Sequence, residues 1–333
     1  MSRTIRWGVL GVSGIAQEKI LPALAKACNA QVDLLGSRDP AKATQVGQQF
    51  DVRRGGASYD AVIADPQIEA IYVSLPNTMH HEWIIKALDA GKAVLSDKPL
   101  TVSSAEAKSV AAKSRETGLP VMEGLMYRFH PQNRYVVEQL AAGAVGEVRE
   151  VQVYNAFRLL DIMQPDNIRV WDGAGAGAIM DMGCYVVSAT RMLFGAEPIA
   201  ATGWLDVEPA WGGIDVGCAA TLEYPGKRFA PITWSFRTGY GAGYRVIGTE
   251  AILEVPRSFI PGQAGQITQT VVIRQDRTGR RGEEKRFEPV DQFQLEFEEF
   301  SGALIEGRPP RFDVDDAVAN AKALELVKAL PAK

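Results

Sequence analysis

A lysine at the end of an apolar strand is the first residue of this chain with an evident chemical use. In the stretch KAVLSDKPL, residues 93–95 predict a buried strand, and Pro99 has no N–H to donate to a sheet, so the strand must end before it. Ligands of open α/β sheets bind at the carboxyl ends of the strands. The ammonium group of Lys98 can therefore hold a cofactor or take part in a proton transfer.

A glycine-rich turn, GVLGVSGIA, follows the first apolar strand and opens a predicted helix. It matches the pattern G-x-G-x-x-G/A, in which the first glycine permits a tight turn and the helix N-terminus offers free N–H groups to a pyrophosphate. The chain departs from this pattern at the second glycine, where it has Ser13. The predicted dinucleotide-binding turn comprises Gly11, Val12, Ser13, Gly14 and Ile15.

The end of the second predicted strand bears on the choice between NAD and NADP. NAD enzymes usually have an acidic residue at this place for the ribose hydroxyls. Here the strand ends in Ser37 and Arg38, and Arg38 can pair with a 2′-phosphate through two parallel hydrogen bonds. Asp39 is better used as the N-cap of the helix that begins at Pro40. The sequence therefore favours NADP and leaves NAD open, with a simple surface arginine as the alternative for Arg38.

Strands and helices alternate over the first 125 residues. Alternation of this kind predicts a doubly wound parallel sheet with right-handed crossovers, a Rossmann domain over residues 1–125. We expect its strands at residues 5–11, 31–37, 70–76, 92–98 and 119–125.

The pattern changes after residue 125. Strands at hairpin spacing predominate, which is typical of a large, mostly antiparallel sheet. We expect this second domain to span residues 126–333, with helices at 131–143, 178–194, 291–307 and 314–330.

Composition excludes several classes of function. The net charge of −4 gives no basic field for nucleic acid, and no apolar run approaches the roughly 20 residues needed to cross a bilayer. The N-terminal residues MSRTIRWGVLG do not have the pattern of a signal peptide, and three widely separated cysteines favour reduced thiols in the cytoplasm. The three histidines show no spacing typical of metal ligands. We therefore expect a cytoplasmic protein without a nucleic-acid, membrane or metal partner.

Four stretches carry a resemblance to a known family: GVLGVSGIA, LPNTMHH, SDKPL and AGAIMDMGCY. Through them the chain resembles the Gfo/Idh/MocA (glucose–fructose oxidoreductase) family over almost its whole length. EGLMYRFHPQ resembles the D-xylose dehydrogenase-like and sugar ketoreductase-like branch of that family. The resemblance implies a dinucleotide-binding domain, a C-terminal substrate domain with a large open sheet, and NAD(H) or NADP(H) as the cofactor. The open face of that sheet commonly forms a dimer interface, so a homodimer or homotetramer is implied.

The resemblance also assigns residues to the cofactor cleft. The family's E-K-P motif appears here as Asp97-Lys98-Pro99, which implies that Lys98 lies beside the nicotinamide and the substrate hydroxyl. The cofactor residues implied beyond the glycine turn and the second strand are Ser74, Leu75, Pro76, Asn77, His80, Asp97, Lys98 and Arg128.

Many members of the family have a histidine where this chain has Tyr185. In having a tyrosine at this position, the chain resembles the sugar oxidoreductase branch rather than the inositol dehydrogenases. Hydride transfer from a carbinol needs a base for the hydroxyl proton. Tyrosine, with an ordinary pKa of about 10, is a poor base unless a cation such as Lys98 lowers that pKa. Lys98 and Tyr185 are therefore the predicted catalytic pair. Without the family match, a core tyrosine would be the better interpretation.

Further substrate contacts are implied where the chain crosses into the second domain and in the later loop. Tyr127 and His130 follow the last strand of the first domain, and ligand sites often lie between domains. Arg169 matches an arginine of related sugar enzymes, and Asp181 lies one helical turn before Tyr185. The alternative for Arg169 is that it tethers a loop, and the alternative for His130 is that it only begins a helix.

The function that the resemblance implies is an NADP-dependent sugar dehydrogenase that oxidises an aldose at C1. The alternatives are a 3-ketosugar reductase, including one that acts on a nucleotide-linked sugar, and an aldose–aldose or glucose–fructose type of oxidoreductase that retains its cofactor. A dinucleotide-binding regulator is the non-enzyme alternative. It predicts the loss of the lysine or of the acid/base residue, and Lys98 and Tyr185 are both present.

Overall fold

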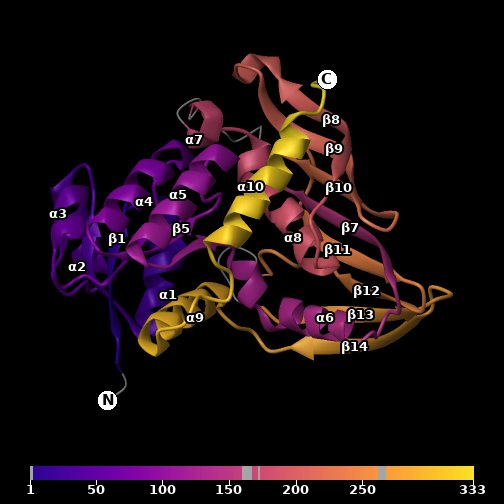
Figure 1. Cartoon of the computed structure of the whole chain (residues 1–333), viewed down its shortest axis with the longest axis horizontal. Coiled ribbons are helices and arrows are strands. Elements are labelled where there is room, and N and C mark those ends of the chain that lie inside the picture. Colours follow the sequence, from indigo (N-terminus) through magenta and orange to yellow (C-terminus); the bar gives the residue numbers. More distant parts are fainter. Residues whose placement is uncertain (1–2, 160–166, 172, 262–267) are drawn as a thin grey trace. The chain divides into compact units, whose positions relative to one another are not determined.

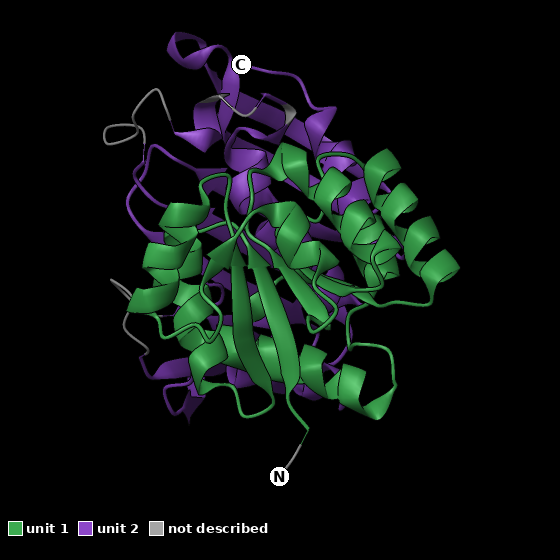
Figure 2. Ribbon diagram, turned by 90° about the vertical axis from the view of Figure 1, so that its left-hand side faces the viewer, with its two compact units in different colours: residues 1–126, 291–318 green, residues 127–290, 319–333 purple. Residues whose placement is uncertain are grey.

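The computed structural model describes residues 3–159, 167–171, 173–261 and 268–333 (Figure 1). The chain forms two compact units, which Figure 2 distinguishes by colour. The first unit consists of residues 1–126 and 291–318, and the second of residues 127–290 and 319–333. The first unit thus contains a late segment of the chain that the sequence analysis assigned to the second domain.

A six-stranded parallel sheet forms the centre of the first unit. Its order is β3-β2-β1-β4-β5-β6, which is the order of a doubly wound dinucleotide-binding fold. The strands are β1 (Ile5–Leu10), β2 (Ala30–Gly36), β3 (Gly56–Ala57), β4 (Ala70–Val73), β5 (Ala93–Asp97) and β6 (Val121–Gly124). The predicted fold class of this part is confirmed.

Helices alternate with these strands. The helical segments of this unit are η1 (Ala16–Ile20), α1 (Leu21–Lys26), α2 (Pro40–Gln49), α3 (Tyr59–Ala64), η2 (Asn77–Met79), α4 (His80–Asp89), α5 (Ser104–Thr117) and α9 (Gln292–Glu306). Helices α2, α3, α5 and α9 each begin at a residue whose side chain caps the helix. Ser103, for example, accepts a hydrogen bond from the amide of Glu106, and Gly118 ends the same helix in the left-handed conformation.

Helix α9 belongs to the first unit because its aromatic side chains pack on β1. The ring centroids of Phe297 and Phe300 lie 5.1 Å and 5.6 Å from that of Trp7. The indole N–H of Trp7 donates to Ser301 Oγ at 3.1 Å. All four side chains are buried, so this late helix completes the core of the first sheet.

The second unit contains an eight-stranded sheet of order β14-β13-β12-β11-β7-β10-β9-β8. Among the strands that the structure describes, only β7 and β10 pair in parallel, so the predicted large, mostly antiparallel sheet is confirmed. The strands are β7 (Val148–Ala156), β8 (Ala200–Glu208), β9 (Ile214–Tyr224), β10 (Arg228–Ser235), β11 (Gly241–Gly248), β12 (Ala251–Val255), β13 (Thr270–Asp276) and β14 (Arg281–Phe287).

One face of this sheet carries buried side chains and packs against helices, whereas the other is open. Val153 of β7 and Trp234 of β10 are buried, and the alternating positions Tyr154 and Phe229 are exposed. The helical segments that the structure describes here are η3 (Met126–Phe129), α6 (Pro131–Ala141), α7 (Ile168–Trp171), η4 (Gly173–Gly175), η5 (Ile179–Gly183), α8 (Cys184–Phe194), η6 (Pro209–Trp211) and α10 (Val314–Lys328). The first residue of η3 and the first residues of α10 belong to the first unit.

Candidate functional site

The glycine turn after β1 has the geometry of a dinucleotide loop. Gly11 has a φ of +102°, and a Cβ there would overlap the carbonyl oxygen of Ser74, so only glycine fits. The hydroxyl of Ser13 lies 2.7 Å from Ser74 Oγ and accepts the amide N–H of Ala16 at 3.1 Å. Ser13 therefore ties the turn to the end of β4 and caps the following helical turn. Val12 is buried, and Gly14 and Ile15 are exposed.

The end of β2 leaves a guanidinium accessible. Asp39 accepts hydrogen bonds from the amides of Ala41 and Lys42, so the predicted N-cap of α2 is confirmed. Ser37 is buried and accepts the amide N–H of Asp39. Arg38 is exposed, and among the described residues no carboxylate pairs with it. The strand end thus offers a cation, while its acidic neighbour is already used by the backbone.

The loop that carries Lys98 follows β5 directly. Asp97 Oδ1 accepts the amide N–H of Lys98 at 2.8 Å, and the Lys98–Pro99 peptide is cis. His80 is completely buried, with Nδ1 2.9 Å from the carbonyl oxygen of Pro99 and Nε2 2.9 Å from that of Leu75. His80 therefore contacts the backbone of two loops. A direct contact between His80 and a cofactor stays a prediction.

The predicted cofactor residues between β4 and α4 lie in the same unit as this loop. Ser74 and Leu75 are buried, and the amide of Ser74 donates to the carbonyl of Leu10 in β1. Pro76 and Asn77 are partly exposed, and Asn77 begins the short helix η2. The structure thus brings together the ends of β1, β4 and β5, at the edge where open α/β sheets bind ligands.

Tyr185 lies in the first turn of α8 and is 7% exposed. Its ring centroid is 6.0 Å from that of Tyr127 and 5.6 Å from that of Phe259. The hydroxyl of Ser188, one turn further along α8, lies 2.8 Å from the Tyr127 hydroxyl and accepts hydrogen bonds from Nε and Nη2 of Arg128. Ser188 therefore joins Tyr127 and Arg128, both buried, to the helix that carries Tyr185.

Arg169 and Asp181, both predicted to contact substrate, form an ion pair. Arg169 Nε donates to Asp181 Oδ2 at 2.7 Å, and Nη2 lies 3.4 Å from Oδ1. The amide of Gly177 donates to the carbonyl of Arg169, and the amide of Asp181 donates to that of Gly177. A carboxylate is also a hydrogen-bond acceptor of the kind that binds sugar hydroxyls.

His130 is fully buried and acts as the N-cap of α6, where Nδ1 accepts the amide N–H of Gln132. Burial lowers the pKa of His130 to about 4, so its ring is neutral at neutral pH. The structure thus shows the helix-starting role that the sequence analysis named as the alternative. A contact between His130 and substrate stays a prediction.

Two carboxylates in these regions, one buried (Glu123) and one half-buried (Asp215), were not identified from the sequence. Glu123 of β6 accepts the amide N–H of Leu100 at 2.9 Å, and Asp215 of β9 accepts the amide N–H of Ile179 at 2.7 Å. Burial raises the pKa of Asp215 to about 6. A Cβ on Gly177, which has a φ of +92°, would overlap the Asp215 carboxylate. No local pattern marks these acids, because their partners lie 23 and 36 residues away in the chain.

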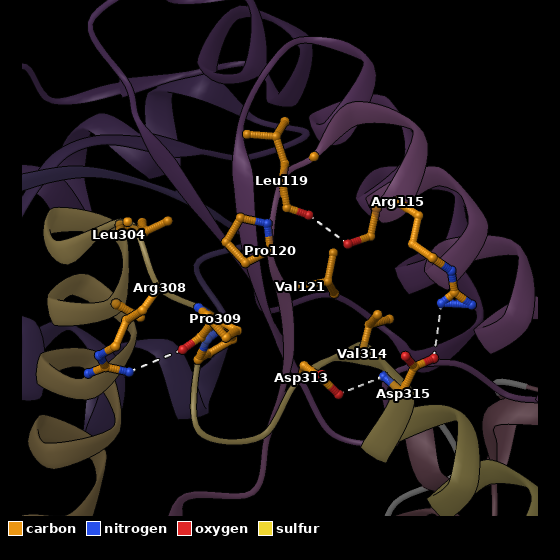
Figure 3. Close-up of a pocket in the computed structure, with 15 residues that line it drawn as sticks. Arg115, Leu119, Pro120, Val121, Leu304, Arg308, Pro309, Asp313, Val314 and Asp315 are labelled. Carbon is orange, nitrogen blue, oxygen red and sulfur yellow. Dashed lines mark hydrogen bonds and ion pairs between the residues drawn. The ribbon is translucent and has the colours of Figure 1, made fainter.

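A separate hollow of about 440 Å³ in the first unit contains none of the predicted site residues. It lies by the start of β6, away from the carboxyl ends of the strands, and Figure 3 shows Arg115 paired with Asp315 at its wall. Among the described residues, no group of three or more His, Cys, Asp and Glu side chains could hold a metal ion. Within the same residues, no helix combines the length and apolar character needed to span a membrane.

Comparison with known proteins covers both units. Residues 5–125 match the model of an oxidoreductase family with an NAD-binding Rossmann fold, and residues 133–254 match the GFO/IDH/MocA C-terminal domain. The chain is 32% identical over 323 residues to D-xylose 1-dehydrogenase (NADP(+)) 2 from Haloferax volcanii, which covers 96% of this chain and 95% of that protein.

Two solved structures are similar over nearly the whole chain. A 3-ketoreductase from Actinomadura kijaniata, in complex with NADP and TDP-benzene, is 30% identical with a TM-score of 0.86, and the match covers 99% of this chain and 98% of that one. An aldose-aldose oxidoreductase from Caulobacter crescentus, complexed with glycerol, is 25% identical with a TM-score of 0.87 and coverage of 98% and 97%.

Proposed function

The chain belongs to the Gfo/Idh/MocA family of NAD(P)-binding oxidoreductases, and from this premise we propose that it transfers hydride between a sugar carbinol and NADP. The observation that carries the proposal is full-length similarity to enzymes named for action on sugars, in a chain that keeps Lys98 at the end of β5 and Tyr185 in the first turn of α8. A regulator without activity would not need both groups.

The residues present fit a nicotinamide dinucleotide. Gly11, with its positive φ and no room for a Cβ beside Ser74, makes the tight turn that a dinucleotide-binding loop requires after the first strand. Arg38 is exposed at the end of β2, and Asp39 is used as a helix cap, so the strand end favours a 2′-phosphate over free ribose hydroxyls. NADP is therefore the proposed cofactor. When bound, it would accept or supply the hydride.

The proposed roles of the protein groups follow from their chemistry. The Tyr185 phenol takes the hydroxyl proton during oxidation and returns it during reduction. The Lys98 cation, beside the same hydroxyl, favours the phenolate and holds the oxygen in place. Asp181, oriented by Arg169, accepts hydrogen bonds from other hydroxyls of the sugar. Tyr127 and Arg128, held by Ser188, support the turn of α8 that carries Tyr185.

The proposed substrate is a free aldose that is oxidised at C1 to a lactone. A 3-ketosugar reductase is the second candidate, and the similarity to the Actinomadura kijaniata reductase with bound TDP-benzene favours it. Structures of that reductase with a lysine replaced and with a tyrosine replaced are also similar to this chain, and these are the two residue types proposed here for catalysis.

The absorbance of reduced nicotinamide tests this function. Purified protein is assayed with NADP and with NAD against a panel of pentoses and hexoses, and with NADPH against 3-ketosugars, free and nucleotide-linked. We expect aldose-dependent reduction of NADP at a higher kcat/KM than with NAD. Turnover only of 3-ketosugars would establish the second candidate. Binding of NADP with no turnover in either direction would contradict both and support a regulator.

We also propose that a second copy of the chain packs on the open face of the eight-stranded sheet, where Tyr154 and Phe229 are exposed, to form a homodimer or homotetramer. Cytoplasmic action is proposed as well, in keeping with three free cysteines. Sedimentation equilibrium tests the assembly, and a monomer at all protein concentrations would contradict it.

A further inference from the structure

Side chains from two other elements hold the backbone of the loop that carries Lys98. The carbonyl oxygen of Pro99 faces His80 Nδ1 at 2.9 Å, and the amide N–H of Leu100 donates to Glu123 Oε1 at 2.9 Å. We propose that His80 and Glu123 are positioning residues that fix where the Lys98 side chain begins. This inference rests on the proposed function, in which Lys98 acts on the substrate hydroxyl.

Glu123 reaches the loop from the neighbouring strand. It lies on β6 opposite Ser96 of β5, so its carboxylate spans from one strand to the residues that follow the other. Glu123 is 6% exposed, and its hydrogen bond to Leu100 is buried. A buried amide that loses its acceptor keeps the full cost of desolvation, so this contact strongly favours one conformation of the loop.

His80 joins this loop to the one after β4. Its ring lies between the carbonyl oxygens of Leu75 and Pro99, each 2.9 Å from a ring nitrogen, and no part of His80 is exposed. A neutral imidazole donates to one of the two oxygens, and a doubly protonated ring donates to both. In either state the ring sets the spacing between the segment proposed to line the cofactor and the loop with Lys98.

The reason for such support is the length of the lysine side chain. Four flexible methylenes separate the ammonium group of Lys98 from its backbone, so a displacement of the Cα also displaces the ammonium group. A misplacement of about 1 Å can reduce catalysis by about a hundredfold. Asp97 adds a third contact, since its carboxylate accepts the amide N–H of Lys98. Three successive residues, 98–100, thus each have a backbone group held by a side chain.

The test compares Glu123→Leu, Glu123→Gln and His80→Leu with the wild-type protein. Glutamine keeps an oxygen that can accept the Leu100 amide, whereas leucine has none. Glu123→Leu and His80→Leu should lower kcat by roughly tenfold to a hundredfold, and Glu123→Leu should change KM and NADP affinity by less than about threefold. Glu123→Gln should recover turnover toward the wild-type value. Hydrogen exchange of the Leu100 amide should be faster in Glu123→Leu than in Glu123→Gln.

Ser301→Ala is the matched control, since it removes the acceptor of the buried Trp7 indole within the same unit and does not touch this loop. The control should keep kcat even if its melting temperature falls. An unchanged kcat in Glu123→Leu, or a loss no larger than in the control, would overturn the proposal. If Glu123→Leu does not fold, His80→Leu provides the same kinetic comparison.

The two proposals fail in different ways. A wild-type protein that turns over no sugar contradicts the proposed function, and Leu100 exchange then decides the positioning role alone. Equal exchange rates in the leucine and glutamine variants refute the positioning role, whatever the activity of the wild type.

Discussion

Replacing Asp215 by asparagine should remove a pH-dependent contribution to stability in the second unit. The carboxylate of Asp215 lies in β9 and accepts the amide N–H of Ile179, at the start of the helical segment that carries Asp181 and Tyr185. Burial raises the pKa of this carboxyl from 3.8 to about 6. Asparagine keeps an oxygen for Ile179 but does not titrate in this range, so the variant isolates the ionisation.

The sign and size of the effect follow from proton linkage. The folded protein holds this proton more tightly than the unfolded chain, so its contribution to stability is complete below pH 3.8 and is lost as the pH rises through about 6. A shift of about two units corresponds to about 3 kcal/mol in full, at about 1.4 kcal/mol per unit. About 2 kcal/mol of this loss falls between about pH 4.5 and about pH 7.5.

Urea unfolding of both proteins across this pH range measures the effect. The unfolding free energy of the wild type minus that of Asp215→Asn should fall by about 2 kcal/mol as the pH rises over that range. Asp276→Asn is the control, because a hydrogen bond from Thr278 lowers the pKa of this exposed carboxyl below 3.8, so its difference should stay nearly constant over this pH range. A difference for Asp215→Asn that does not vary with pH would refute the reasoning.

Three other substitutions test separate parts of the site. Lys98→Ala should abolish most turnover and spare NADP binding measured by fluorescence titration, and wild-type activity in this variant would remove Lys98 from the mechanism. Arg38→Ala should raise the dissociation constant of NADP far more than that of NAD, whereas an equal effect on both would show that Arg38 does not bind the 2′-phosphate. Gly177→Ala should lower the melting temperature, since its φ of +92° costs a residue with a Cβ about 1–2 kcal/mol and the Cβ would overlap the Asp215 carboxylate. An unchanged melting temperature would contradict the last expectation.

The sequence predicts the two kinds of sheet well, because each depends on a local pattern. Alternating strands and helices favour the parallel sheet, and closely spaced strands favour the antiparallel one. The placement of α9 was not predictable in this way. The apolar positions Phe297 and Phe300 identify a buried face, but no local feature shows that this face packs on Trp7 of β1.

The same distinction holds within the site. The Asp39 cap was predictable because its partners follow two and three residues later. Glu123 and Asp215 bind amides of distant segments, so only the folded chain reveals them. The spacing of three residues puts Ser188 on the same helical face as Tyr185, yet its contact with Tyr127 depends on tertiary packing. The joint action of Lys98 and Tyr185 stays a prediction.

The packing of α9 on β1 has a consequence for biosynthesis. Trp7 and Ser301 are 294 residues apart, so a ribosome that adds about 5–20 residues per second needs about 15–60 s between the two. During that interval the nascent first sheet has an uncovered aromatic surface, which a chaperone can shield. A gene fragment that stops after residue 126 would lack this cover permanently, so the nucleotide-binding part should be expressed with residues 291–318 supplied by fusion or as a separate peptide.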